Sequence, residues 1–395
     1  MKRILYVHQV SSVGGASFCL LNIIKGLDRQ KYAPSVLLKE NGPLAEEFRK
    51  LGVTVFFLPS LCAIPYNKSF SDWRTWLGYF HVYITCKQFA KFLREHHFDL
   101  VYLNNMMLYP YLKEIKDCAS IIHVREHWPL DEHKKQLAKA QHYVKRYATR
   151  VVAINHYSAS IFANCSDKAD IVYDWIDMSC RHKEIPFNDI FGEDVSNKKV
   201  YLFTGGTNWT KGPQTVVDVF VNHMKGDDKR LLILGMKKKQ MSNSLKQKVK
   251  GVLKLFGRKD SYEQLKKLIE SDSRIKCIPS VYEIADIMQQ AYCSLSYFAI
   301  PHANLALAEG IIMGLPCIAA ETSESLEYSK NGKLAMLFGF GNKKAFVEAV
   351  NRMENQYIDM KSRLKNEAKD VAEMFSASRN IEALNNIYSS IFDTK

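Results

Sequence analysis

Two junctions between an apolar run and a helical pattern carry residues suited to binding an anion. At 204–213 the chain reads Gly205-Gly206, then Lys211-Gly212-Pro213. Gly212 and Pro213 suit the N-cap and first position of a helix, so Lys211 would lie beside its positive end. The helix macrodipole favours anions there, so a lysine fits best if a diphosphate lies between them. The alternative is a lysine in a solvated loop.

The second junction, 298–310, adds a carboxylate. Asn304 is a good N-cap, and we expect the amides of Leu305 and Ala306 to face phosphate oxygens. Glu309 is conspicuous in an otherwise apolar helical pattern, where it would accept hydrogen bonds from ribose hydroxyls. The alternative is that Glu309 satisfies a neighbouring backbone group or an ion pair.

A weaker junction near the start of the chain has the same character. Gly14 and Gly15 follow the first apolar run and precede a helical pattern. Paired glycines let the backbone approach a ligand closely, and a helix start offers unpaired amides to an anion. A plain tight turn would use the same residues. We predict that Gly14 and Gly15 contact the same donor.

A cluster of polar residues ends the apolar run 121–124. His123, Arg125, Glu126 and His127 follow one another there. Burying polar groups at a strand end costs free energy unless they bind a partner or remain solvated. We predict that Arg125 and Glu126 are catalytic cleft residues, with His123 and His127 next. A structural ion pair is the alternative.

Thirteen short apolar runs, rich in β-branched residues, alternate with helical patterns such as 16–27 and 72–95. This alternation is typical of parallel sheets covered by helices on both faces. The runs are 4–7, 35–38, 53–58, 100–103, 121–124, 151–154, 171–173, 200–203, 231–234, 275–278, 293–297, 317–319 and 334–338.

The polar segment 177–199 interrupts this rhythm once. We therefore predict an α/β protein with a Rossmann-like domain over 1–176, a linker over 177–199 and a second Rossmann-like domain over 200–375. Two such domains facing each other would form a cleft at the carboxyl ends of their strands, where ligands bind in this architecture.

Together, the junctions at 204–213 and 298–310 resemble those of the retaining GT-B glycosyltransferases of the family 4 type, also called glycosyl transferases group 1. The resemblance covers nearly the whole chain. It implies that Gly205, Gly206 and Lys211 cradle the diphosphate of a nucleotide-sugar donor, and that Glu309 contacts the ribose. It also implies that the last helix, 376–395, returns to the first domain.

The chain departs from this family pattern at two positions. Thr207 stands where the family usually has an arginine, and Pro301 stands where it usually has a glutamate that contacts the transferred sugar. A catalytically silent GT-B-like binding partner is therefore an alternative to an active transferase. A sugar phosphorylase or an epimerase of the same fold is another. A periplasmic binding protein has two such lobes, but the cysteines and the missing signal sequence argue against it.

The composition of the chain also gives expectations about its cofactors and its cellular compartment. The nine cysteines are scattered singly, which fits reduced thiols better than a disulfide framework. The first apolar run is too short for a secretory signal, so we expect a cytoplasmic protein. The chain contains no Asp-x-Asp motif. We therefore predict a metal-independent reaction, without a cofactor, in which Lys211 and helix N-termini stabilise the departing diphosphate.

The net charge of +14 favours an anionic partner. Residues 237–259 contain nine Lys or Arg and no acid. A basic amphipathic helix there would bind the inner face of an anionic membrane, and a solvated helix packed on the second sheet is the equal alternative. No nucleic-acid-binding signature accompanies the charge, so nucleic acid is not expected. A glycan or lipid-linked acceptor, as in cell-surface polysaccharide biosynthesis, suits the basic surface.

Overall fold

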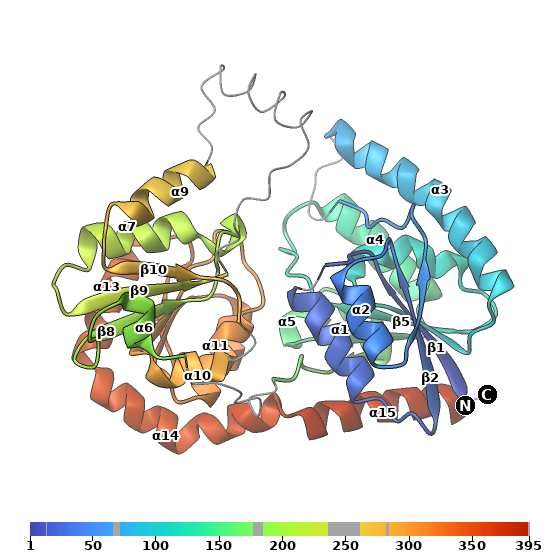
Figure 1. The fold of residues 1–395 in the computed structure, drawn as a ribbon. Helices are drawn as coiled ribbons and strands as arrows, with labels where there is room; N and C mark the ends of the chain where they lie inside the picture. Colours follow the sequence, from blue (N-terminus) through green and yellow to red (C-terminus); the bar gives the residue numbers. More distant parts are fainter. Residues whose placement is uncertain (13, 66–71, 177–184, 236–260, 282–283, 394–395) are drawn as a thin grey trace. The chain divides into compact units, whose positions relative to one another are not determined.

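A computed structural model describes residues 1–393 of the chain, apart from 13, 66–71, 177–184, 236–260 and 282–283. The chain divides into two compact units (Figure 1). The first contains Met1–Ile176 and Met374–Lys395, and the second contains Asp177–Glu373. The basic segment 237–259 lies outside the described residues.

The first unit is built on a seven-stranded sheet in which every neighbouring pair is parallel. The order β3-β2-β1-β4-β5-β6-β7 makes the chain change direction across the sheet between β1 and β4. Ligands bind beyond the carboxyl ends of the strands at such a switch point. The strands are β1 (Lys2–His8), β2 (Tyr32–Leu38), β3 (Thr54–Phe57), β4 (Leu100–Leu103), β5 (Ala119–Val124), β6 (Arg150–Ala153) and β7 (Ala169–Ile171).

Helices cover both faces of this sheet (Figure 1). One apolar layer joins the sheet to α3, α4 and η1, and the other joins it to α1, α2 and α15. Apolar strands buried on both faces explain why their sequences are apolar at nearly every position. The helices are α1 (Gly15–Lys25), α2 (Pro43–Lys50), α3 (Trp73–Glu95), α4 (Lys134–Tyr147), α5 (His156–Ser160) and α15 (Ala377–Asp393), with 3₁₀ segments η1 (Met106–Glu114) and η2 (Ala163–Lys168).

The C-terminal helix α15 belongs to the first unit. Leu384, Ile387 and Tyr388 are buried in its core. The Tyr388 hydroxyl lies 3.0 Å from the hydroxyl of Tyr6 on β1. Asn380 accepts a hydrogen bond from the Tyr173 amide at 2.9 Å. These contacts hold α15 against the sheet although some 200 residues of the second unit intervene in the sequence.

The second unit has a six-stranded parallel sheet in the order β10-β9-β8-β11-β12-β13. Its switch point lies between β8 and β11. Its strands are β8 (Lys199–Phe203), β9 (Lys229–Leu234), β10 (Ile275–Ile278), β11 (Cys293–Ser296), β12 (Cys317–Ala320) and β13 (Met336–Phe338). Its helices are α6 (Phe187–Phe191), α7 (Pro213–His223), α9 (Ser261–Glu270), α10 (Ile284–Gln290), α11 (Leu305–Ile312), α12 (Ser323–Tyr328), α13 (Lys343–Asn355) and α14 (Tyr357–Met374), with the 3₁₀ segment η3 (Trp209–Lys211).

All thirteen predicted strands occur, and the predicted class of two parallel-sheet α/β domains is confirmed. The expected linker, 177–199, does not extend over its full predicted range. Within 177–199, residues 187–199 form α6 and lead into β8 as part of the second unit. Phe187, Phe191 and Val195 are buried in its core. These three apolar side chains are separated by polar residues, which gave the segment the composition of a linker.

Eight cysteines lie among the described residues, and all eight are free thiols. Across the same part of the chain, no helix combines the length and the apolar character needed to cross a membrane.

Candidate active site

The loop after β8 is built on glycines that allow close backbone contacts. Gly206 has a φ of +55°, and a Cβ atom there would lie 2.3 Å from the carbonyl oxygen of Gly235. A Cβ on Gly205 would lie 2.2 Å from the Phe203 ring and 2.7 Å from the Cβ of Lys211. These glycines therefore let the loop fold tightly beside the base of the Lys211 side chain.

Lys211 lies at the end of η3, next to the start of α7. The Asn208 side chain caps η3 by accepting a hydrogen bond from the Thr210 amide at 3.2 Å. Gly212 follows with a φ of +69°, and a Cβ there would lie 2.6 Å from the Tyr297 carbonyl oxygen. The Ala299 amide donates to the Thr210 carbonyl at 2.9 Å. The loops after β8 and β11, on either side of the switch point, are thus held together.

The N-terminus of α11 is fixed by Asn304, which is buried. Its Oδ1 accepts from the Leu307 amide at 3.2 Å, and its Nδ2 donates to the Ser296 hydroxyl on β11 at 2.8 Å. Asn304 therefore caps the helix and ties the cap to the end of β11. Leu305 and Ala306 occupy the first turn, whose amides have no acceptor within an α-helix.

Lys211 and Glu309 interact electrostatically across these two loops. Burial lowers the pKa of Lys211 to about 8, and the Glu309 carboxylate opposes this shift. Burial raises the pKa of Glu309 to about 7, and the Lys211 ammonium opposes that shift. The Lys211 ammonium also lies 4.3 Å from the centroid of the Phe298 ring. The second unit therefore brings together a cation, a carboxylate and two helix N-termini, which together suit a phosphorylated ligand with hydroxyl groups.

In the first unit, polar side chains lie at the carboxyl ends of β1, β4 and β5. Arg125 is buried and forms an ion pair with Asp174. Its Nε donates to the Asn104 Oδ1 at 3.2 Å, and its Nη2 lies 3.2 Å from the His123 Nδ1. Asn104 in turn lies 3.3 Å from the His8 Nδ1. Arg125 thus forms the internal ion pair that was the alternative to a cleft role.

The two histidines of this network are held neutral. Burial, and then the Arg125 charge, lowers the pKa of His8 to about 4 and places the pKa of His123 well below its usual range. His8 Nε2 lies 3.0 Å from the Ser17 hydroxyl, and His123 Nδ1 lies 2.6 Å from the Tyr102 hydroxyl. A neutral imidazole can offer either a donor or an acceptor to a ligand.

The other two residues of the 123–127 cluster have different surroundings. The Glu126 carboxylate accepts from the Met106 amide at 3.2 Å and the Arg125 amide at 3.0 Å, and burial raises its pKa to about 7. The His127 ring stacks on Tyr157 at 4.2 Å between centroids. Glu126 is thus linked to the network of Arg125 and His123 through the Arg125 amide, whereas the ring of His127 packs on α5.

Gly14 and Gly15 adjoin this network through α1, which carries Ser17. A Cβ on either glycine would have open space around it. Their own unit therefore gives no steric reason for glycine, unlike Gly205 and Gly206. The sequence reasoning did not single out Asn104 and His8 as site residues. Both stand where a buried strand ends at the switch point, the signal that would have found them.

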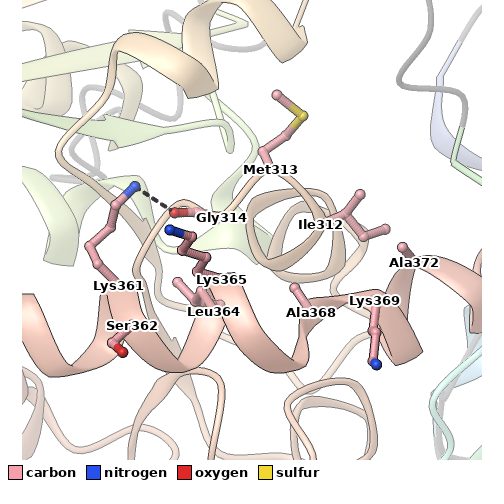
Figure 2. A pocket seen from close by; sticks show the side chains of 10 residues that line it. All are labelled: Ile312, Met313, Gly314, Lys361, Ser362, Leu364, Lys365, Ala368, Lys369 and Ala372. Carbon is pink, nitrogen blue, oxygen red and sulfur yellow. Dashed lines mark hydrogen bonds between the residues drawn. The ribbon is translucent and has the colours of Figure 1, made fainter.

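A cavity of about 660 Å³ lies elsewhere in the second unit, between the end of α11 and α14 (Figure 2). Lys361, Lys365 and Lys369 line it from α14. Lys361 donates to the Gly314 carbonyl at 2.8 Å, as a cation at a helix C-terminus commonly does. Lys211 and Glu309 do not line this cavity. Among the described residues, no group of three or more His, Cys, Asp or Glu is arranged to hold a metal ion.

Comparison with known families gives a match to the second unit. Residues 187–371 match the family model described as glycosyl transferases group 1. The matched region contains Lys211, Glu309 and both loops that hold them. A sequence search of curated proteins gives no match.

Solved structures with the same fold align over nearly the whole chain. HepE from Anabaena, in complex with UDP-glucose, aligns with 17% identity and a TM-score of 0.74 over 99% of this chain and 100% of its own. Sucrose-phosphate synthase from Thermosynechococcus elongatus aligns with 12% identity and a TM-score of 0.71, and the alignment covers 100% of both chains. WaaG, a glycosyltransferase involved in lipopolysaccharide biosynthesis, aligns with 13% identity and a TM-score of 0.63 over 97% of this chain and 99% of its own. These similarities show that the fold is GT-B.

Proposed function

We propose, from the match of residues 187–371 to the glycosyl transferases group 1 model, that the chain is a glycosyltransferase that moves a sugar from a nucleotide-diphosphate donor to a glycan or lipid-linked acceptor. The observation that carries the proposal is the coupling of Lys211 to Glu309 beside the N-termini of α7 and α11. A UDP-sugar is the first donor to test, because HepE was solved with UDP-glucose.

Each residue of the second-unit site has a proposed role. Lys211 neutralises the diphosphate, together with the first-turn amides of α11 at Leu305 and Ala306. Gly205 and Gly206 let the loop backbone approach the phosphates. Glu309, when ionised, accepts hydrogen bonds from the ribose hydroxyls. We propose that Gly14 and Gly15 contribute to the same donor from the first unit.

The proposed reaction is a metal-independent transfer that retains the anomeric configuration. The bond from the anomeric carbon to the diphosphate oxygen breaks, and a bond from that carbon to the acceptor oxygen forms. The nucleoside diphosphate departs with the bonding electron pair, and its released oxygen takes the proton that the acceptor hydroxyl loses. Fixed positive charge from Lys211 stabilises the leaving group as its charge develops. Retention follows from the family resemblance.

The acceptor side is proposed for the first unit. Arg125 is charged and buried with Asp174, so we propose that it positions His123 while His123 and Glu126 act nearest to the sugar. His127, which stacks on Tyr157, is proposed at the rim of this site. We propose a cytoplasmic reaction in cell-surface polysaccharide biosynthesis, by analogy with the role stated for WaaG.

Lys211 provides the direct test. We expect Lys211→Ala to weaken binding of UDP by at least about tenfold, because a hydrogen bond to a charged group typically contributes more than one factor of ten. Lys344→Ala, at an exposed lysine of the same unit, is the matched control and should bind as the parent does. Isothermal titration calorimetry measures both. Equal affinities for parent and Lys211→Ala would remove Lys211 from the site.

A separate assay distinguishes the enzyme from a silent partner. Pro301 stands in the loop before α11 and motivates the silent alternative. Donor hydrolysis and transfer are measured with UDP-sugars that bind. Binding without either reaction would favour the silent partner, and turnover that depends on inorganic phosphate would favour a phosphorylase.

Contact of residues 237–259 with an anionic membrane is a further part of the proposal, based on the nine basic residues of that segment. Charge-neutralising substitutions of Lys237, Lys238 and Lys239 should reduce flotation with anionic vesicles at physiological salt. Unchanged flotation would remove this segment from the membrane contact.

A further inference from the structure

The helix α3 of the first unit has large apolar side chains on its outer face. They recur at the three- and four-residue spacing that places side chains on one side of a helix. Each is between 41% and 65% exposed, which is unusual for so many large apolar residues in one row. The row consists of Trp73, Trp76, Leu77, Phe80, Tyr83 and Ile84.

The core of the unit does not account for this row. The opposite face of α3 provides Val82, Cys86 and Phe89 to the core beneath it, together with the buried Thr75. These side chains attach the helix to the unit, where α3 runs along the outside (Figure 1). The helix therefore has two apolar faces, one buried in the core and one exposed.

The outer face changes character along the helix. After Ile84 it continues with Lys87, Lys91 and Arg94, all exposed. The Lys87 ammonium lies 4.9 Å from the centroid of the Tyr83 ring, where the apolar part meets the basic part. The acidic residue within α3 is Glu95, whose carboxylate lies 3.8 Å from the Lys91 ammonium. The outer face is therefore apolar in its first half and positively charged in its second half.

We propose that the outer face of α3 binds the surface of an anionic lipid bilayer. Tryptophan, tyrosine and phenylalanine have apolar rings that enter the boundary between headgroups and acyl chains, and Trp and Tyr are enriched at that depth. Lys87, Lys91 and Arg94 complement anionic headgroups, in keeping with the chain's net charge of +14.

The order of side chains along α3, with an apolar part followed by a basic part, favours a bilayer over a protein partner. The apolar part covers only 73–84, a length too short to span a bilayer, so the helix would lie in the plane of the interface. A basic flank beside an aromatic row is the pattern of helices that bind anionic lipid in this way. This proposal concerns described residues of the first unit and does not depend on the sugar-transfer site or on 237–259.

Vesicle binding tests the proposal with the full chain. We expect cosedimentation with vesicles of phosphatidylglycerol and phosphatidylcholine, and weaker binding to phosphatidylcholine alone. Trp76→Ser with Phe80→Ser should weaken binding by at least about tenfold, because each large apolar group withdrawn from lipid contributes about one factor of ten or more. Ile358→Ser, at an exposed apolar residue of α14, is the control and should bind as the parent does.

A charge variant tests the second half of the face. Lys87→Gln with Lys91→Gln should reduce binding to anionic vesicles and make it less dependent on salt, while binding to neutral vesicles stays the same. Lys365→Gln with Lys369→Gln on α14 is the matched control with the same loss of charge. Brominated lipid should quench tryptophan fluorescence in the parent, and Trp73→Phe with Trp76→Phe should lose that quenching.

Three results would overturn the proposal. The first is a parent chain that does not bind anionic vesicles. The second is a Trp76→Ser, Phe80→Ser variant that keeps the parent's circular dichroism and melting temperature and binds vesicles equally well. The third is a parent dimer in sedimentation velocity that becomes monomeric in that variant, which would assign the face to a second copy of the chain.

Discussion

At the scale of single residues, Lys211 and Glu309 depend on each other for their charge. Burial favours the neutral form of each, and the opposite charge of the partner restores part of the ionised form. An arriving diphosphate would favour the protonated lysine further. The pair is therefore poised between protonation states near neutral pH, where a small change in environment alters its charge.

Donor binding should consequently have a narrow pH optimum. With UDP-glucose we expect affinity to rise as pH increases through about 7, where Glu309 ionises, and to fall as pH increases through about 8, where Lys211 loses its proton. Calorimetry between about pH 6 and about pH 9 measures this. Lys211→Arg, which stays charged, should lose the alkaline decrease, and Glu309→Gln should lose the acidic one. An alkaline decrease that persists in Lys211→Arg would assign it to another group.

Gly212 should tolerate substitution much less than a glycine of similar conformation elsewhere. Gly212 and Gly314 have φ values of +69° and +65°, but only Gly212 has the Tyr297 carbonyl at a Cβ position. We expect Gly314→Ala to cost about 1 kcal/mol in unfolding free energy, and Gly212→Ala to cost about 1–3 kcal/mol more. Thermal unfolding measures both. Equal costs would show that the Tyr297 contact relaxes freely.

The residues proposed for the second-unit site depend on local sequence more than those proposed for the first unit. Lys211 and Asn304 lie in the loops after β8 and β11, and Glu309 lies in the helix α11 that follows the second loop, so a few local rules fix their positions. Arg125 and His123 contact each other, but the other partners of Arg125, Asp174 and Asn104, lie far away in sequence. A single sequence does not reveal which distant polar groups pair inside a unit, so it left the ion pair as one of two alternatives.

At the scale of elements, α11 is positioned by its cap. Asn304 joins the helix N-terminus to Ser296 at the end of β11, so the first-turn amides are fixed relative to the sheet. Helix α13 of the same unit has a comparable cap. Asn342 accepts a hydrogen bond from the Ala345 amide at 3.0 Å. The two caps differ in their distance from the switch point.

Removing either cap should therefore cost a similar amount of stability, but only removal of the Asn304 cap should affect ligand binding. We expect Asn304→Ala and Asn342→Ala each to cost about 1 kcal/mol of unfolding free energy. Asn304→Ala alone should also weaken UDP binding, because the amides of Leu305 and Ala306 lose their fixed direction. Calorimetric titration of both variants compares them. Loss of UDP affinity in Asn342→Ala would mean that stability rather than position controls binding.

Strands were easier to predict than the short helices. Most strands contain a short run of apolar residues that can be recognised without knowledge of the neighbouring elements. The 3₁₀ segment η1 contains Pro110, and α6 has two phenylalanines within a polar stretch. Neither has enough turns to show a helical period. Their structure depends on the core that they complete, which the sequence alone does not describe.

At the scale of the whole molecule, each unit has its own apolar core. The first unit has an apolar layer on each face of its sheet, and the second has a core joining α6, β8, β9 and α10. Domains with separate cores can unfold separately. A ligand of one unit should then stabilise that unit without changing the other to the same extent.

Scanning calorimetry should accordingly show two unfolding transitions, one for each unit, and a ligand or substitution in one unit should shift only the transition of that unit. UDP should raise the melting temperature of the second-unit transition. Leu384→Ala on α15 should lower only the first-unit transition, at a cost of about 2–5 kcal/mol, because it removes a buried side chain from that core. Ile358→Ser, at an exposed site, is the control. A single transition that both changes shift equally would mean that the units unfold together.

The return of α15 to the first unit also determines the order of events on the ribosome. Translation completes every residue of the second unit before it reaches α15. The part of the sheet face that receives Leu384, Ile387, Tyr388 and Ile391 therefore stays uncovered while about 200 further residues are made, although α1 and α2 can already cover the rest of that face. Domains generally fold as units during synthesis, with the N-terminal one first. Here the later unit can finish first, and the earlier one exposes an apolar surface to chaperones until α15 has been made.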